Sequence, residues 1–160
     1  MNKILLNLFL IILVSLTLSG CGSDSNQKYE GFMMPESVAE GPDGSIYVSE
    51  IGERDIDKDG KISKINRDGT IETVASGLYD PKGIVFHNDK GSIYVSEIGE
   101  RDIDKDGKIS KIKADGTIET VASGLFDPKG IVFHNDKLYV TDRDVVIEVD
   151  LDGTWQVYAG

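Results

Sequence analysis

Two short aspartate-rich segments hold the residues whose types and spacing are best suited to chemistry in this chain. Both read Asp-Ile-Asp-Lys-Asp-Gly, once at residues 55–60 and again at residues 102–107. Alternate carboxylates place oxygen donors on one side of a tight loop, and the glycine permits the turn that wraps them around a hard cation. The spacing therefore predicts two Ca²⁺-binding loops of the Asp-x-Asp-x-Asp-Gly type.

Each predicted loop has four ligands: three aspartate side chains and the backbone carbonyl of the lysine two residues after the last aspartate. The predicted metal ligands are Asp55, Asp57, Asp59 and Lys61 in the first loop and Asp102, Asp104, Asp106 and Lys108 in the second. Further candidate carboxylates are Glu50, Glu53, Glu97 and Glu100.

These segments are not EF-hands. The twelfth loop position, where an EF-hand has a bidentate glutamate, holds Asn66 or Lys113, and the flanking residues predict strands instead of helices. We therefore expect hairpin loops in which Ca²⁺ has a structural role and binds weakly, with a Kd of about 10⁻⁴ to 10⁻³ M. The alternative is an acidic, solvated hairpin without a metal.

The two loops belong to a longer internal repeat. Residues 44–90 and 91–137 are the same 47-residue unit, and the copies differ only at Asn66/Lys113, Arg67/Ala114 and Tyr79/Phe126. Short β-like runs between Gly- and Asp-containing turns, repeated at such a period, are typical of β-propeller blades. The repeat does not strengthen the calcium hypothesis, because a duplication copies a useless loop as faithfully as a useful one.

Four strands are predicted in each unit. In the second unit the β-branched and aromatic runs cover residues 83–87, 92–97, 108–113 and 117–122. The first two runs are apolar on both faces, which indicates a sheet that lies between neighbouring sheets. Tyrosines recur at one strand position, and packing between blades explains them better than a ligand-stacking platform. They are Tyr47, Tyr94 and Tyr139.

We predict an all-β fold, with about three four-stranded propeller blades within residues 35–160. The expected blades span residues 37–75, 83–122 and 130–159. A propeller ring needs about four to eight blades, so three blades leave two faces uncovered. Three arrangements fit: part of a longer propeller, two chains that complete a six-bladed ring, or an open array. The first is favoured, because residue 160 falls at a blade junction.

The N-terminus resembles a bacterial lipoprotein signal. Lys3 precedes an apolar stretch at residues 4–18, and Leu18-Ser19-Gly20-Cys21 resembles a lipobox. We therefore predict a signal peptide at residues 1–20, a fatty acyl group such as palmitate on Cys21, and a tether at residues 21–34. The expected location is the cell envelope, with the chain anchored to a membrane and facing the periplasm or the exterior. The alternative is a simple secretory signal with an incidental cysteine.

Charge and cysteine content exclude several classes of protein. The formal net charge is −11, which argues against nucleic acid and anionic membrane surfaces as partners. The single cysteine rules out a disulfide within one chain. The sequence contains no nucleophilic triad and no phosphate-binding loop, so no catalytic residue is predicted.

The third predicted blade carries the motif of a known family. Residues 127–133, Asp-Pro-Lys-Gly-Ile-Val-Phe, and residues 137–142, Lys-Leu-Tyr-Val-Thr-Asp, resemble the NHL-repeat and gluconolactonase/senescence-marker-protein propeller superfamily. In the gluconolactonase branch, the resemblance implies a catalytic divalent metal in the central channel, held by a Glu of the first blade and by Asn and Asp at later Pro-x-Gly positions. Glu36 matches the first ligand. Lys82 and Lys129 occupy the later positions, and their ammonium groups repel a cation.

The same three positions predict a second site. Equivalent positions on the innermost strands converge at the channel mouth, so Glu36, Lys82 and Lys129 are candidate ligand-binding residues there, with the lysines suited to an anion. The alternative is a set of solvated turn lysines. We favour an unknown small-molecule or protein ligand and a binding module, with a metal-dependent, gluconolactonase-like hydrolase whose active site is incomplete in this chain as the alternative function.

Overall fold

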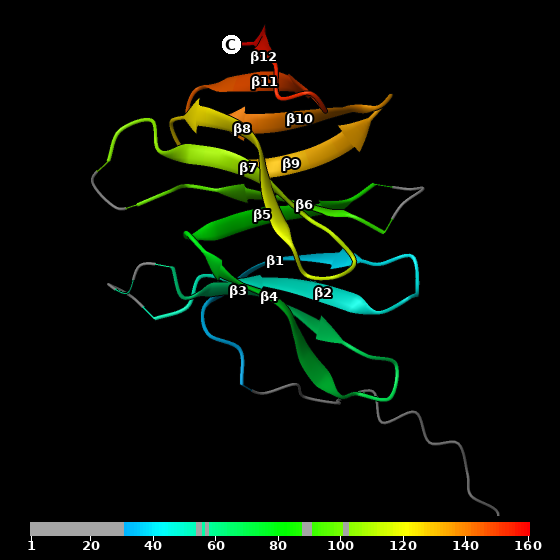
Figure 1. Cartoon of the computed structure of the whole chain (residues 1–160). Helices are drawn as coiled ribbons and strands as arrows, with labels where there is room; N and C mark the ends of the chain where they lie inside the picture. The colour runs from blue at the N-terminus through cyan, green and yellow to red at the C-terminus, as the bar shows by residue number, and fades with distance from the viewer. Residues whose placement is uncertain (1–30, 54–55, 57, 88–90, 101–102) are drawn as a thin grey trace, which may run out of the picture.

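The structure, a computed structural model, describes residues 31–53, 56, 58–87, 91–100 and 103–160. These residues form twelve β-strands (Figure 1). Among them, no helix is long and apolar enough to cross a membrane. The strands are β1 (Pro35–Glu40), β2 (Ile46–Glu50), β3 (Gly60–Ile65), β4 (Ile71–Leu78), β5 (Pro81–Phe86), β6 (Ile93–Glu97), β7 (Gly107–Ile112), β8 (Ile118–Leu125), β9 (Pro128–His134), β10 (Lys137–Asp142), β11 (Val145–Asp150) and β12 (Trp155–Ala159).

The strands form three four-stranded antiparallel sheets, which confirms the predicted all-β fold with about three blades. The sheets have the orders β1-β2-β3-β4, β5-β6-β7-β8 and β9-β10-β11-β12, and we call them blades 1, 2 and 3. Successive strands are neighbours, so each blade is a meander of hairpins. The outermost strands are longer than predicted: β8 ends at Leu125 instead of Ala122, because Leu125 pairs with Gly107 beyond a register shift.

An aspartate–glycine turn closes the outer hairpin of every blade. In blade 1, Asp68 Oδ1 accepts a hydrogen bond from Thr70 N at 3.0 Å, and Gly69 between them has a φ of 86°. Such a φ strains a residue with a Cβ, so the glycine suits this position. The same turn recurs at residues 115–117 and 152–154. Short-range turn chemistry therefore sets the hairpin register that the strands then extend.

The hydrophobic core lies between the blades. One buried cluster joins blade 1 to blade 2, and a second joins blade 2 to blade 3. Tyr47 and Tyr94 lie in the two clusters at equivalent positions, which confirms the packing role predicted for them. The first cluster contains Tyr47, Ile62, Ala75 and Leu78 of blade 1 and Ile84, Ile93, Val95 and Ile112 of blade 2.

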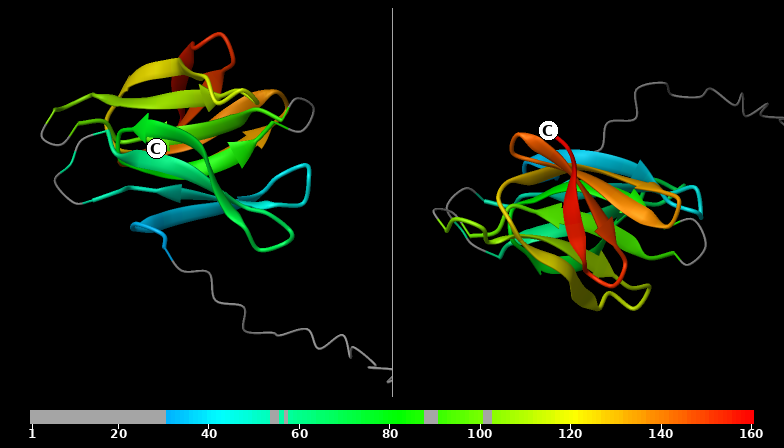
Figure 2. Two further views of the ribbon diagram at one scale, coloured as in Figure 1. Left: turned by 60° about the horizontal axis from the view of Figure 1, so that its bottom comes forward. Right: turned by 90° about the horizontal axis from the view of Figure 1, so that it is seen from above.

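The innermost strands β1, β5 and β9 lie next to one another, and the blades fan outward from them (Figure 2). Ser49 Oγ of blade 1 donates a hydrogen bond to the Lys82 carbonyl of blade 2 at 2.6 Å. Ser96 Oγ of blade 2 donates the same bond to the Lys129 carbonyl of blade 3 at 2.5 Å. A side-chain hydroxyl therefore fixes the next inner strand at both junctions.

Candidate functional site

One end of the blades carries the candidate site. The β2–β3 and β6–β7 hairpin loops lie there, next to the segments that enter each blade. Two backbone hydrogen bonds join them: Ile51 N donates to the Met34 carbonyl, and Ile98 N donates to the Asp80 carbonyl. We call this end the hairpin face. It is formed by the described residues of the loops at 51–59 and 98–106, the crossovers at 79–80 and 126–127, and the turn at 143–144.

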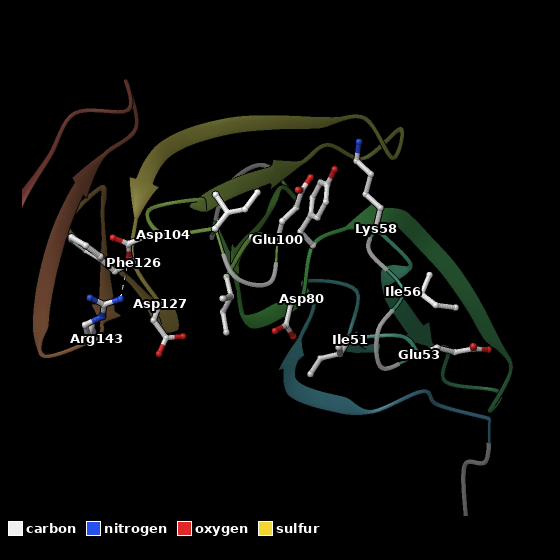
Figure 3. Close-up of a pocket in the computed structure, with 14 residues that line it drawn as sticks. Ile51, Glu53, Ile56, Lys58, Asp80, Glu100, Asp104, Phe126, Asp127 and Arg143 are labelled. Carbon is white, nitrogen blue, oxygen red and sulfur yellow. Dashed lines mark hydrogen bonds and ion pairs between the residues drawn. The ribbon is translucent and has the colours of Figure 1, made fainter.

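The hairpin face contains a pocket of about 430 Å³ that all three blades line (Figure 3). Most of the lining comes in pairs from equivalent positions of the repeat. The lining pairs are Ile51/Ile98, Glu53/Glu100, Ile56/Ile103, Tyr79/Phe126 and Asp80/Asp127, and the remaining residues are Lys58, Gly99, Asp104 and Arg143. The pocket is thus a product of the duplication, which placed the same residue types on both of its walls.

The lining combines apolar surface with an excess of acid. Among the described lining residues, four isoleucines and two aromatic rings supply the apolar part, whereas five carboxylates face two basic side chains, Lys58 and Arg143. Apolar walls with a few charged groups are typical of ligand pockets. The excess of carboxylates favours a ligand that brings a positive charge beside apolar groups.

Basic side chains cover the two aromatic rings of the pocket. Lys58 Nζ lies 5.0 Å and Lys108 Nζ 4.8 Å from the centre of the Tyr79 ring. Arg143 Cζ lies 4.5 Å from the centre of the Phe126 ring. These distances are those of cation–π contacts. A hydrogen bond with Tyr79 raises the pKa of Lys58, so this side chain stays charged at neutral pH.

The last aspartate of each Asp-rich loop closes its own hairpin. Asp59 Oδ2 accepts a hydrogen bond from Glu53 N at 2.7 Å, and Asp106 Oδ2 accepts the equivalent bond from Glu100 N at 2.8 Å. Asp59 Oδ1 is buried and has no hydrogen-bond partner among the described residues. A buried carboxylate oxygen without a donor fits a cation ligand, because its desolvation is otherwise uncompensated.

The other predicted metal ligands are dispersed or lie outside the described residues. Asp104 is exposed, and its Oδ1 lies 3.4 Å from Arg143 Nη2. Lys61 and Lys108 lie within β3 and β7, just after the loops. Asp55, Asp57 and Asp102 lie outside the described residues. Within the described ranges, no three His, Cys, Asp or Glu side chains come together as a metal cluster, so both calcium loops stay a prediction.

Glu97 is one of the further candidate carboxylates for the metal, and in the structure its contacts are with groups of its own chain. It is fully buried at the end of β6, and its Oε2 accepts a hydrogen bond from Tyr79 N at 2.7 Å. Its Oε1 accepts a hydrogen bond from Ser110 Oγ, and Lys108 Nζ lies 3.5 Å from Oε2. Both oxygens are therefore engaged by groups that fix the crossover into blade 2.

The same buried acid recurs in every blade. Glu50 at the end of β2 accepts hydrogen bonds from Met33 N and Ser63 Oγ. Asp142 at the end of β10 accepts a hydrogen bond from Asp127 N at 2.6 Å. We call Glu50, Glu97 and Asp142 the carboxylate clamp. The sequence signal was the acid that follows Tyr-Val-Ser or Tyr-Val-Thr in all three blades, but its role requires knowing that the crossover returns to this point.

The structure brings two of the predicted channel-mouth residues together. Lys82 Nζ lies 3.1 Å from Glu36 Oε1 and 2.9 Å from Asp80 Oδ1. Lys129 Nζ lies 2.8 Å from Asp127 Oδ2, and the hydrogen bond with Asp127 raises the pKa of Lys129. Each lysine is therefore balanced by an acid of its own chain. Their use for an anionic ligand stays a prediction.

Comparison with known proteins places the fold but not the activity. No protein-family model matches the chain, and no curated protein sequence matches it. Solved structures do match. A structure of the nidogen/laminin complex shares 22% identity and a TM-score of 0.61, over 76% of this chain and 44% of the other.

Two bacterial structures match over a larger part of this chain. A gluconolactonase from Xanthomonas campestris shares 18% identity and a TM-score of 0.64, over 82% of this chain and 49% of the other. An auxiliary nutrient binding protein from Bacteroides thetaiotaomicron shares 14% identity and a TM-score of 0.65, over 82% and 33%. The chain thus spans less than half the length of these structures. Blade architecture and matches together show a partial β-propeller fold of about three blades, similar in structure to part of each of these proteins.

Proposed function

We propose that this chain is an extracytoplasmic binding module, anchored to a membrane through a lipid on Cys21, whose hairpin face recognises a partner with a basic group beside apolar side chains. The observation that carries the proposal is the pocket of about 430 Å³, lined by four isoleucines, two aromatic rings and five carboxylates. Structural similarity to a nutrient-binding protein and to a nidogen/laminin complex supports a binding role for the fold.

Glu53 and Glu100 carry the preference for a basic partner, because the other three carboxylates of the pocket already lie beside basic side chains. Asp80 and Asp127 are already paired with lysines, and Asp104 lies near Arg143. Glu53 and Glu100 add two carboxylates to the lining at equivalent positions. Because the whole chain has a formal net charge of −11, its field also attracts cations from a distance. The isoleucines then supply the apolar area that holds the partner.

A charge-matched peptide pair tests this function. We expect a short peptide of alternating Lys and Leu to bind in isothermal titration calorimetry, and its Glu–Leu counterpart not to bind. In the double variant Glu53→Gln plus Glu100→Gln, the Lys–Leu peptide should bind about tenfold more weakly, a loss of about 1.4 kcal/mol. The hydrogen bonds from residues 53 and 100 to the loop aspartates use backbone N–H groups, so the variant retains them.

The repeat offers a matched control for this experiment. Glu72 and Glu119 are also equivalent acids, on the outermost strands β4 and β8, and they do not line the pocket. Glu72→Gln plus Glu119→Gln removes the same charge and should leave binding within about twofold of the wild type. Equal losses in both double variants would reduce the effect to net charge and contradict a specific site.

Calcium is proposed to stiffen the two hairpin loops. Asp55, Asp57 and Asp59 would hold one ion, and Asp102, Asp104 and Asp106 the other, with the Lys61 and Lys108 carbonyls. A bound cation removes the repulsion between neighbouring carboxylates that opposes the folded loop. The buried Oδ1 of Asp59, which has no hydrogen-bond partner among the described residues, supports this assignment.

Thermal melting with and without Ca²⁺ tests the loop sites. Millimolar Ca²⁺ should raise the Tm of the wild type by several degrees, which follows from preferential binding to the folded state. Asp57→Asn plus Asp104→Asn should abolish the rise while retaining the hairpin bond of Asp59. As a control, Asp68→Asn plus Asp115→Asn changes two turn aspartates outside the loops and should preserve the rise. A wild-type Tm that does not respond to millimolar Ca²⁺ would exclude the sites.

Lipid anchoring has its own test at Cys21. In a bacterial host, the wild type should incorporate labelled palmitate and sediment with membranes. Cys21→Ala should incorporate none, because the variant lacks the cysteine sulfur to which the lipid is attached. Ser23→Ala is the control, because Ser23 lies close to Cys21 in the sequence but is not the predicted site of the acyl group. Labelling of Cys21→Ala at the wild-type level would disprove the assignment.

A lactonase is the second candidate function, favoured by structural similarity to a gluconolactonase. Lys82 and Lys129 at the positions where the resemblance implies metal ligands weigh against it. The test is hydrolysis of D-glucono-δ-lactone by the purified chain with millimolar Ca²⁺. Turnover well above the uncatalysed rate would replace the binding-module proposal, whereas a rate equal to the blank is the result that the binding module predicts.

A further inference from the structure

Two sheet faces have no neighbour among the described residues. On blade 1, Val38 and Ile46 are 67% and 39% exposed. On blade 3, Val132 and Tyr158 are 54% and 63% exposed. Figure 1 shows these sheets as the outer members of the stack of three, with blade 2 between them. We call the uncovered side of blade 1 the leading face and that of blade 3 the trailing face.

The repeat shows what each face is built to contact. The register places Val38 and Ile46 where blade 2 has Ile84 and Ile93, and those two residues are buried against blade 1. The leading face therefore has the positions that elsewhere receive the preceding blade. By the same comparison, the positions on the trailing face of blade 3 are equivalent to those through which blade 2 contacts blade 3.

The hydroxyl that fixes each inner strand is present on the trailing face as well. Ser49 and Ser96 donate to the inner-strand carbonyls of the next blade. Thr141 occupies the equivalent position of blade 3, and its Oγ1 accepts a hydrogen bond from Gly130 N at 2.8 Å. Among the described residues it has no acceptor. The carbonyl that corresponds to those of Lys82 and Lys129 on the leading face belongs to Glu36.

Gly130 leaves room for that inner strand. At the junction of blades 2 and 3, a Cβ on Gly83 would overlap the Lys129 carbonyl oxygen, so the position of β9 leaves no room for a side chain there. Gly130 is the equivalent residue of blade 3. A Cβ on Gly130 would come no nearer than 3.3 Å to another group, the hydroxyl of Thr141. The space that glycine provides at this position has no occupant within the described chain.

Charge is also complementary between the two faces. Within the chain, Glu36 on β1 and Lys82 on β5 form an ion pair across the junction of blades 1 and 2. Lys129 is the equivalent residue on β9, and it is 57% exposed. If a second β1 followed blade 3, Lys129 would meet another Glu36, which repeats the opposite-charge pairing of the first junction.

We propose that the trailing face of one chain packs against the leading face of a second copy, and that two such junctions close a six-bladed ring with twofold symmetry. Thr141, Gly130 and Lys129 meet Glu36 of the second copy at each junction. A head-to-tail contact that closes after two copies gives a discrete dimer and leaves neither face exposed.

Light scattering tests the ring, because it measures the mass of the assembly in solution. Residues 22–160 are used, since all twelve strands and both core clusters lie within this range. The proposal predicts a discrete mass of two chains. Val132→Glu places a charge on the trailing face and should reduce the mass to one chain. Val157→Glu is the matched control. Val157 is 58% exposed on the outermost strand, and it pairs with Ile147, which is buried against blade 2. Val157 therefore lies on the side of the sheet opposite the trailing face, so this variant should stay dimeric.

Each other outcome overturns the proposal. A monomeric wild type would mean that further blades from another source cover the faces, and a continuous series of larger masses would mean an open array. A dimer that survives Val132→Glu would use a different surface. Loss of the dimer in both variants would mean that an added charge on either side of blade 3 prevents dimerisation, so the effect would not locate the interface. Circular dichroism confirms that each variant is folded, so a monomer caused by unfolding is recognised.

Discussion

Glu97→Ala is expected to lower the free energy of unfolding by about 3–5 kcal/mol. The variant removes a fully buried carboxylate and leaves Tyr79 N–H and the Ser110 hydroxyl without their acceptor, while Lys108 loses its counter-charge. Buried donors without partners cost more than the bonds themselves contribute. Small domains are stable by about 5–15 kcal/mol, so much of the stability should be lost. Urea denaturation followed by circular dichroism measures the change.

Two controls separate the carboxylate clamp from a general effect of charge. Glu97→Gln preserves the shape and one acceptor oxygen, and it should fall between the wild type and Glu97→Ala. Glu119→Gln removes an exposed acid that pairs with Lys113, and exposed pairs contribute little. If Glu97→Ala were as stable as Glu119→Gln, the clamp would not be what fixes the crossover at Tyr79.

Gly83→Ala is expected to destabilise the chain by about 1–3 kcal/mol, as overpacking of a tight contact does. The added methyl group would overlap the Lys129 carbonyl oxygen and press on Ile131. Backbone cannot rotate away as a side chain can, so β5 and β9 must separate. The second core cluster, which contains Tyr94 of blade 2 and Leu138 of blade 3, would then loosen. Urea denaturation, with near-ultraviolet circular dichroism as the probe of aromatic packing, measures both effects.

Gly130→Ala is the matched control for this prediction. It adds the same methyl group at the equivalent position of blade 3, where the nearest group is the Thr141 hydroxyl at 3.3 Å. At a concentration low enough to keep the chain monomeric, its stability should stay close to that of the wild type. Similar losses at both positions would mean that the backbone preferences of glycine and alanine within a strand, not the approach of β9, explain the effect.

Most of the fold was predictable from the sequence. The repeat gave the period, the Asp-Gly turns gave the hairpins, and the β-branched runs gave the strands, because each of these signals is local. The ends of β4 and β8 were predicted too early. Leu78 and Leu125 continue these strands through register shifts opposite Gly60 and Gly107, and such a shift depends on the partner strand instead of the local sequence.

The site was less accessible to sequence reasoning. Glu97 looked like one more acid near an Asp-rich loop, and only the return of the chain to Tyr79 shows that it is buried and engaged. The pocket could not be foreseen either, because its walls come from separate copies of the repeat. The aspartate spacing, in contrast, was visible at once, although Asp59 uses one oxygen to close its hairpin.

The most direct test of the central claim is to map the peptide on the molecule. Amide shifts in a ¹⁵N spectrum, recorded while the Lys–Leu peptide is titrated into the chain, locate the bound surface. The account predicts concentration-dependent shifts at Gly99, Ile103 and Phe126 on the hairpin face, and none at Gly41 or Thr70 on the opposite end of the blades. Shifts confined to that opposite end, or no shifts at millimolar peptide, would contradict a binding site in the pocket.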